Sequence, residues 1–165
     1  YVKKMNFPIE ILPWIAMGSA IFHFAVSFAV LLLAYGAIHS TLQWTIIFFP
    51  LILLPFIFLI VGFSWFLASL GVYLRDIAQT MGLLTTSLLF LSPVFYPLTV
   101  MPEKARPFFY LNPLTFIIEQ TRSIVLRGEM PNWKGLGFYF LVSLIISWLG
   151  FLWFQKTRKG FADVL

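Results

Sequence analysis

The chain has 165 residues, of which 61% are hydrophobic and only 10% are charged. A soluble domain averages about 25% charged residues and under about 50% apolar ones, so this composition excludes a water-soluble globular fold. The net charge is +5, but the eleven Lys and Arg residues lie scattered between apolar runs and form no basic helix typical of nucleic-acid binding. Cysteine is absent and histidine occurs twice, which excludes a disulfide framework and a metal centre built from these residues.

The first two apolar runs predict transmembrane helices. Residues 15–38 carry no formal charge and, at about 1.5 Å per residue, are long enough to cross a hydrocarbon core of about 30 Å. Residues 44–74 also lack charges but exceed that length, and Pro50 and Pro55 interrupt their first part. We therefore expect a second span over 46–74, with a kinked lead-in and a straight helix that begins near Pro55.

Two further spans are expected at residues 80–98 and 135–154. Four prolines interrupt or follow the end of the third run and predict that this end is broken or re-entrant, namely Pro93, Pro97, Pro102 and Pro107. The predicted fold is an all-α integral membrane protein with about four transmembrane helices.

Residues 99–134 form the connection between the third and fourth spans and contain a shorter helix. Asn112 is suited to cap its first turn, Pro113 follows, and Gly128 lies just past its end. The helix over 113–127 has one apolar face and one polar face. Because it is too short to cross a bilayer, we expect it to lie in the interface or to enter the membrane part-way.

The distribution of basic residues favours an even number of spans with both flanking segments in the cytoplasm. Residues 1–13 and 155–165 both contain clusters of basic residues, whereas the turn at 39–43 contains none. The first segment is then an inner approach, the last an inner tail, and residues 99–134 an external loop. We expect a single transmembrane domain over residues 1–165.

The sequence contains no glycine-rich phosphate loop, no His-Glu-x-x-His helix and no nucleophile elbow. We therefore predict no catalytic residue and no metal or cofactor bound by this chain. If transport is driven by a nucleotide, another polypeptide or another segment must bind it.

Charged residues near the predicted inner surface have two interpretations. Arg75 and Asp76 stand in a very short turn between two spans, either as a topological anchor or as a contact for a cytoplasmic partner. Residues 1–13 mix Lys3 and Lys4 with apolar side chains, which fits either an anchor on the membrane surface or a docking element for a soluble protein.

Other residues are candidates for an external gate or a transport path. Glu119 and Arg122 are three apart on the short outer helix and can pair across one turn, which is ordinary helix chemistry unless that helix is re-entrant. His23 lies inside the first span, where it is either a relay or a neutral imidazole bonded to a neighbour. Phe95 and Tyr96 belong to a large aromatic set, of which a subset facing a lumen would stack on sugar rings.

Five ordered segments carry a resemblance to a known family. They are KKMNFPIEILP at 3–13, YLRDI at 73–77, SPVFYP at 92–97, NPL at 112–114 and the tail at 154–165. With these segments the whole chain resembles the permease subunits of bacterial polysaccharide exporters of the type 2 ABC transporter family, which move O-antigen, capsule or teichoic-acid polymers. The resemblance implies that the sequence is the C-terminal part of a six-span permease of the bacterial inner membrane.

The same resemblance implies roles for particular residues. Contact with an ATPase subunit is implied for seven residues of the inner segments, namely Lys3, Lys4, Phe7, Pro8, Glu10, Arg75 and Asp76. An external gate is implied at four residues, namely Tyr96, Asn112, Glu119 and Arg122. The candidate path-lining residues beside it are His23, Phe95 and Tyr96.

For the assembly, the resemblance implies two permease copies and two ATPase subunits, which hold ATP and Mg²⁺. The expected partners are a second copy of the chain, the ATP-binding subunit dimer, membrane lipid and a polyprenyl-linked polysaccharide, with no nucleic acid. Two alternatives stay open: an ion- or proton-coupled carrier with His23 as its relay, or an exporter of the same fold whose cargo is a drug or a small glycolipid.

Overall fold

The computed structural model describes residues 11–39, 42–74, 76–104 and 106–158. These residues form helices and turns without a strand, which confirms the all-α prediction. In chain order the elements are α1 (Leu12–His39), the 3-10 helix η3 (Trp44–Phe48), α2 (Phe49–Tyr73), α3 (Ile77–Phe90), the 3-10 helix η4 (Leu98–Val100), α4 (Arg106–Tyr110), α5 (Pro113–Arg122), the π-helical turn η5 (Ser123–Arg127) and α6 (Trp133–Thr157).

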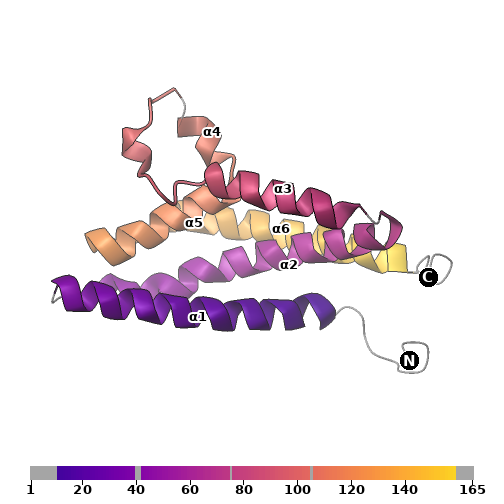
Figure 1. The fold of residues 1–165 in the computed structure, drawn as a ribbon, viewed down its shortest axis with the longest axis horizontal. Coiled ribbons are helices and arrows are strands. Elements are labelled where there is room, and N and C mark those ends of the chain that lie inside the picture. The colour runs from indigo at the N-terminus through magenta and orange to yellow at the C-terminus, as the bar shows by residue number, and fades with distance from the viewer. Residues whose placement is uncertain (1–10, 40–41, 75, 105, 159–165) are drawn as a thin grey trace.

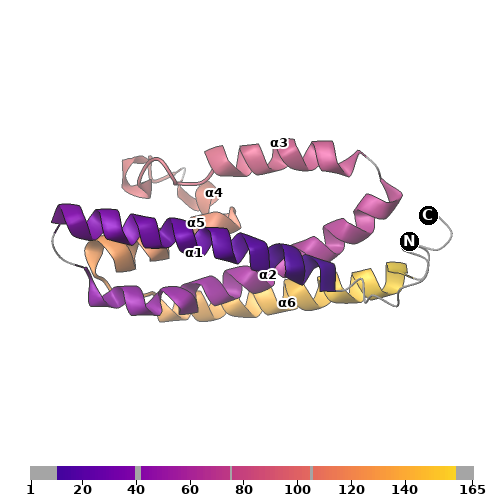
Figure 2. The ribbon, with the colours of Figure 1, turned by 60° about the horizontal axis from the view of Figure 1, so that its bottom comes forward.

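Three long helical stretches form the frame of the molecule. Among the described residues, α1, the stretch Trp44–Tyr73 and α6 are the helices long and apolar enough to cross a membrane. Their 28, 30 and 25 residues, at about 1.5 Å each, all exceed a hydrocarbon thickness of about 30 Å. They run along the longest axis of the molecule (Figure 1), and α2 lies directly against α6 (Figure 2).

α2 and α6 pack most closely because small residues let their backbones approach. A Cβ atom added to Gly150 would lie 2.2 Å from the carbonyl oxygen of Gly62, and one added to Gly62 would lie 2.6 Å from the Cα of Ser147. Ser143, one turn before Ser147, continues the buried stripe of α6. Small residues of this kind drive helix association in lipid, where the hydrophobic effect does not pull helices together.

α2 begins earlier than its prolines suggested. The helix starts at Phe49, directly after η3, so the expected start of a straight helix near Pro55 is wrong. Pro50 stands in the first turn, where a backbone N–H would find no carbonyl partner within the helix, so proline costs no hydrogen bond there. Pro55 is buried inside the helix, and neighbouring helices make such interior prolines tolerable in membrane proteins.

The range 80–98 is not one helix. α3 has 14 residues, which rise only about 21 Å, and ends at Phe90. Pro93 lacks an N–H for the helical ladder and also restricts the residue before it. The chain therefore turns at Ser92, whose N–H donates to the Leu89 carbonyl at 3.2 Å. The break lies earlier than the predicted end at residue 98.

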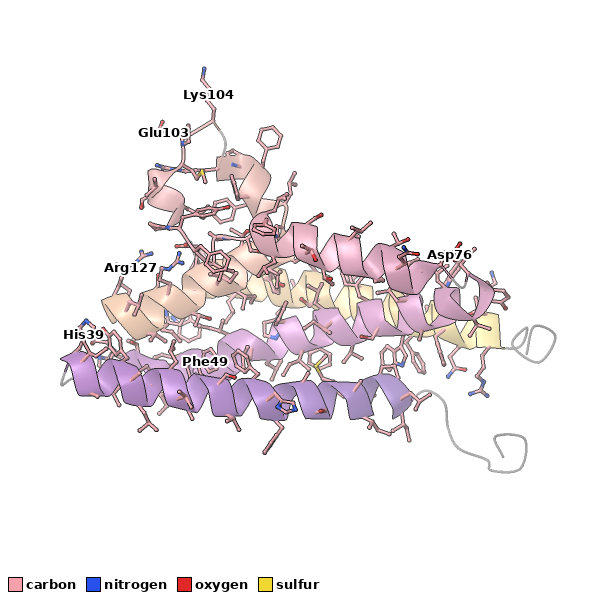
Figure 3. All side chains as sticks on the ribbon, in the orientation of Figure 1. His39, Phe49, Asp76, Glu103, Lys104 and Arg127 are labelled. Atoms are coloured by element: carbon pink, nitrogen blue, oxygen red, sulfur yellow. The ribbon has the colours of Figure 1, made fainter. Side chains whose placement is uncertain are left out.

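The segment between α3 and α5 leaves the bundle sideways. It lies level with one half of the bundle rather than beyond its end (Figure 1). Glu103 and Lys104 stand at its tip, level with Phe49 along the long axis (Figure 3). α5 then begins beside the end of α3, and the helix continues through η5 to the bundle end that carries Arg127 and His39.

Buried side chains connect α5 to this frame. One group joins α2, α5, η5 and the start of α6, namely Phe49, Ile52, Ile117, Ile124, Val125 and Leu136. A second group joins α1, α2 and α6 nearer the opposite end, namely Met17, Val61, Trp65 and Phe154. At that opposite end the Tyr73 hydroxyl also donates to the Thr157 carbonyl at 3.1 Å, which ties α2 to α6.

Candidate functional site

A buried asparagine joins the end of α3 to the start of α5. Asn112 is 6% exposed, and its Oδ1 accepts a hydrogen bond from the Leu114 N–H at 3.0 Å, which caps α5. Its Nδ2 donates to the Ser92 Oγ at 2.9 Å and to the Leu88 carbonyl at 3.2 Å. The Asn112 side chain therefore joins the two ends of the projecting segment, the end of α3 and the start of α5.

Ser92 is the partner that sequence reasoning missed. Its side chain is fully buried, and its Oγ donates to the Leu88 carbonyl at 2.5 Å while it accepts from Asn112. One sequence signal could have found it: Ser92 directly precedes Pro93 at the end of an apolar run. The last carbonyls of a helix have no backbone partner, and a serine hydroxyl can donate to one of them. Because buried polar groups need partners, Ser92 and Asn112 depend on each other.

Arg122 makes a second connection between α5 and the turn after α3. Its Nη1 donates to Glu119 Oε1, and its Nη2 donates to the Pro93 carbonyl at 2.8 Å. Glu119 Oε2 also accepts from Arg127 Nη2 at 3.2 Å. The Arg122 and Glu119 side chains are 19% and 16% exposed, so this pair differs from an exposed helix pair worth about 0.2–0.5 kcal/mol. Removal of one partner leaves the other charge largely shielded from water.

A hydroxyl group holds the π-helical turn η5, which together with α5 forms the helix predicted to lie at the outer side and named the outer helix below. The i→i+5 bonding of a π-turn displaces its carbonyls from the regular helical ladder, and such turns recur at functional sites. Thr45 is fully buried, and its Oγ1 donates to the Ile124 carbonyl of η5 at 2.5 Å. Gly128 ends the turn at φ 67°, and a Cβ atom there would lie 2.6 Å from the Gln43 Oε1. The end of the outer helix is therefore fixed against η3.

The start of α6 is bonded to the same helix. Gln120 Oε1 accepts from the Asn132 N–H at 2.8 Å, and Asn132 Oδ1 caps α6 by accepting from the Gly135 N–H at 3.1 Å. The Tyr139 hydroxyl donates to the Pro113 carbonyl at 3.1 Å. The outer helix therefore has hydrogen-bonded contacts with α3, η3 and α6.

The candidate path-lining residues do not come together. Phe95 is 76% exposed on the projecting segment. Tyr96 lies back on that segment, where its hydroxyl donates to the Phe90 carbonyl at 3.2 Å. His23 is exposed on α1, with the Phe22 ring 5.9 Å away between centroids. α1 and the projecting segment lie on opposite sides of the molecule (Figure 1), so these three residues form no common lining.

Asp76 is the described member of the predicted ATPase contact set. Asp76 is exposed and stands directly before α3. Its carbonyl accepts from the N–H and the hydroxyl of Thr80, both at 3.2 Å. It stands at the bundle end opposite His39 and Arg127 (Figure 3). The other six predicted contacts lie outside the described residues, namely Lys3, Lys4, Phe7, Pro8, Glu10 and Arg75.

Span-length apolar helices, together with an interrupted segment and its polar junction, define a multi-pass membrane protein. Within the described ranges, no group of three His, Cys, Asp or Glu side chains is placed to hold a metal ion. Residues 1–126 match the family described as ABC-2 type transporter, and this chain belongs to that family. The ordered segments predicted this family, and the span-length helices agree with its membrane character.

The curated relatives carry a common name. The chain is 26% identical to the O-antigen export system permease protein RfbA of Myxococcus xanthus, over 98% of the chain and 63% of that relative. It is 25% identical to the protein of the same name from Klebsiella pneumoniae, over 99% of the chain and 63% of that relative. The chain therefore spans 63% of the length of these relatives.

Proposed function

We propose that the chain is the membrane-spanning subunit of an ATP-driven exporter that moves lipid-linked polysaccharide of the O-antigen type across the inner membrane. The names of the relatives support this cargo, and the family supports an ATP-binding partner. The sequence has no phosphate loop, so we assign ATP and Mg²⁺ to a separate subunit. Two permeases and two ATPase subunits form the proposed assembly.

The observation that carries this proposal is the sideways segment between α3 and α5. It is irregular over 91–97 and holds Glu103 and Lys104 level with the bundle (Figure 3). Within a membrane, irregular backbone and charged side chains are tolerated only inside protein or beside water. Hydrocarbon offers no hydrogen-bond partner to the backbone and does not solvate the charges. The face of α3 and α5 from which this segment projects therefore borders a polar path in our proposal, and lipid covers other faces.

The composition of α3 supports the same assignment. Four exposed hydroxyl residues occupy this short helix, namely Thr80, Thr85, Thr86 and Ser87. Their hydroxyls donate to carbonyls of their own helix or its cap, at 2.8 to 3.2 Å, and each hydroxyl oxygen can still accept a hydrogen bond. Such a surface suits a hydroxyl-rich polymer better than acyl chains.

The external gate is proposed at the root of the projecting segment. Asn112 and Arg122 bond the outer helix to the turn after α3, and Glu119 holds Arg122 in place. Opening a path along α3 requires these contacts to break or to move together. Tyr96 belongs to the gate as a side chain that packs on the same turn.

The test is transport by the full permease reconstituted with its ATPase in vesicles. We expect ATP hydrolysis to rise with lipid-linked O-antigen and to be unchanged by a drug or a proton gradient. Asp76→Asn is expected to lower this stimulation severalfold without loss of membrane insertion, whereas the matched control Glu103→Gln at the outer tip leaves it intact.

Two results would replace the proposal. Transport that needs no ATPase, follows the proton gradient and disappears in His23→Ala would assign a coupled carrier. Stimulation by a drug or a small glycolipid alone would keep the exporter and change its cargo.

A further inference from the structure

The outer helix ends one residue out of the register that its terminal glycine favours. Gly128 has φ 67°, the left-handed conformation of a glycine that ends a helix. In both common glycine caps, the N–H of that glycine or of the next residue donates to the carbonyl four residues before the glycine. Here that carbonyl belongs to Ile124. A regular end would therefore bond Gly128 or Glu129 to Ile124.

The hydrogen bonds at this end are different. The N–H groups of Gly128 and Glu129 both donate to the Ser123 carbonyl, the second at 3.2 Å. Both donors thus bond one residue earlier in the chain than a regular cap requires, and the turn is π-helical. The Ile124 carbonyl instead accepts from the hydroxyl of Thr45 at 2.5 Å. A side chain from η3 takes the place of the backbone cap.

Burial makes this exchange of donors matter. Thr45 and Ile124 are both fully buried, so water does not replace a missing donor. A buried carbonyl without a partner is costly, and the Ile124 carbonyl can be satisfied either by Thr45 or by the backbone of a regular cap. The π-turn contains one residue more than an α-turn. The end of the outer helix therefore has two registers in which this carbonyl is bonded.

We propose that Thr45 holds η5 in the π register, and that loss of this contact returns the end of the outer helix to the α register. In the α register, the N–H of Gly128 or Glu129 donates to the Ile124 carbonyl and the Thr45 hydroxyl is not needed. The exchange costs little, because these N–H groups pass from one carbonyl to the next rather than losing a partner. Thr45 is thus a positioning residue for the outer helix.

A change of register in η5 turns α5 about its axis. Each residue of an α-helix advances by about 100°, so a turn that loses one residue rotates α5 relative to the chain after Gly128. Arg122 directly precedes η5, and its Nη2 donates to the Pro93 carbonyl at 2.8 Å. The rotation carries this guanidinium away from Pro93. Thr45 therefore holds the external gate closed, and this part of the inference rests on the proposed function.

An ion pair across η5 belongs to the same register. Arg127, the last residue of η5, donates to Glu119 of α5 at 3.2 Å. The two residues lie on either side of the turn, so their contact depends on how many residues the turn contains. Glu119 also accepts from Arg122. A change in η5 therefore reaches the gate through this carboxylate as well.

Two deletions test whether η5 contains an extra residue. Deletion of Leu126 leaves a regular helical end, so we expect the melting temperature of the full permease to change by no more than about 4 °C. Deletion of Ile118 removes a residue from regular α-helix and rotates the helix after it by about 100°, so we expect a loss several times larger. Both are apolar residues of the outer helix that are not fully buried. Equal losses would overturn the extra residue.

Stimulation of ATP hydrolysis by lipid-linked O-antigen, with the full permease and its ATPase in vesicles, tests the role of Thr45. Thr45→Val keeps the volume and removes the hydroxyl, so the open state becomes more populated. We expect the cargo concentration for half-maximal stimulation to fall by about threefold to tenfold, the effect of one hydrogen bond. Thr45→Ser keeps the hydroxyl and should behave like the parent. Deletion of Leu126 removes the second register, so stimulation should be lost although the protein folds.

The contrary results are equally specific. A Thr45→Val permease that needs as much cargo as the parent, or more, would overturn the proposal, because a purely structural bond gives no gain when it is removed. Full stimulation after deletion of Leu126 would show that no second register is used. A parent that cargo does not stimulate would refute the proposed function instead, and the melting temperatures of the two deletions would still decide whether η5 contains an extra residue.

Discussion

α2 and α6 are held together by close backbone approach, whereas the segment from α3 to α5 is held by a few polar side chains. Gly62 and Gly150 leave no room for a methyl group between the two long helices. At the projecting segment, Asn112, Ser92 and Arg122 form hydrogen bonds that can break one at a time. Close packing resists gradual deformation, whereas a buried hydrogen bond costs about 1–3 kcal/mol when one partner is left without the other. The frame and the candidate gate are therefore built from different forces.

Gly150→Ala is expected to have the largest effect, because it tests the frame directly. The new methyl group would lie 2.2 Å from the Gly62 carbonyl oxygen, so α2 and α6 must separate. We expect a loss of about 3 kcal/mol or more of unfolding free energy, as in the more severe class of packing defects, seen as aggregation on size-exclusion chromatography. Gly137→Ala is the control, since nothing lies within 4 Å of its added Cβ atom. A stable, monodisperse Gly150→Ala protein would contradict the close approach.

Asn112→Ala tests the junction and is expected to cost about 2–3 kcal/mol. It removes the cap of α5 and leaves the buried Ser92 Oγ without its donor. Thermal melting measures the loss. Asn112→Asp keeps the cap acceptor but loses the donor and buries a carboxylate beside the Leu88 carbonyl, so it should cost at least as much as alanine. If both variants melt like the parent, the junction contributes nothing to the fold.

Arg122→Lys tests the second connection, with an expected cost of about 1–2 kcal/mol. Lysine keeps the charge beside Glu119 but cannot reach both Glu119 and the Pro93 carbonyl in the fixed fork of a guanidinium. A double-mutant cycle of Arg122→Gln with Glu119→Gln, in which each substitution removes the ion pair, should show a coupling energy above about 0.5 kcal/mol. Simple additivity of the two substitutions would indicate that the ion pair is not formed.

Thr45→Val is expected to have the smallest effect, about 1 kcal/mol, because one hydrogen bond is lost at nearly constant volume. The Ile124 carbonyl of η5 loses its donor, so amide hydrogen exchange should rise over residues 123–128 before other regions change. Thr85→Val is the control, since its exposed hydroxyl bonds only within α3. Equal exchange in both variants would remove Thr45 from the support of the outer helix.

Local patterns predicted much of the molecule. The cap at Asn112 and the pair of Glu119 with Arg122 involve residues two or three apart, where helix geometry alone brings side chains together. The end of α3 was placed too late, because apolar composition continues past Phe90 although the backbone turns before Pro93. Hydrophobicity reports the environment of a segment more reliably than its secondary structure.

Contacts between distant residues could not be predicted in this way. Asn112 meets Ser92 across 20 positions, Arg122 meets Pro93 across 29, and Thr45 meets Ile124 across 79. A single sequence does not show which residues far apart in the chain lie close in space, and each of these polar residues also suits a solvated turn. The six predicted ATPase contacts outside the described ranges stay sequence predictions.

The sequence by itself determined that the chain belongs in a bilayer, that its long apolar runs are helices, and that a short capped helix stands apart from them. These features follow from composition, length and local spacing, which are properties of neighbouring residues. Only the tertiary structure decided that α2 and α6 form the closest pair and that the segment before α5 projects sideways. It also decided that Arg122 bonds the turn after α3, because such a contact depends on how segments far apart in the chain meet.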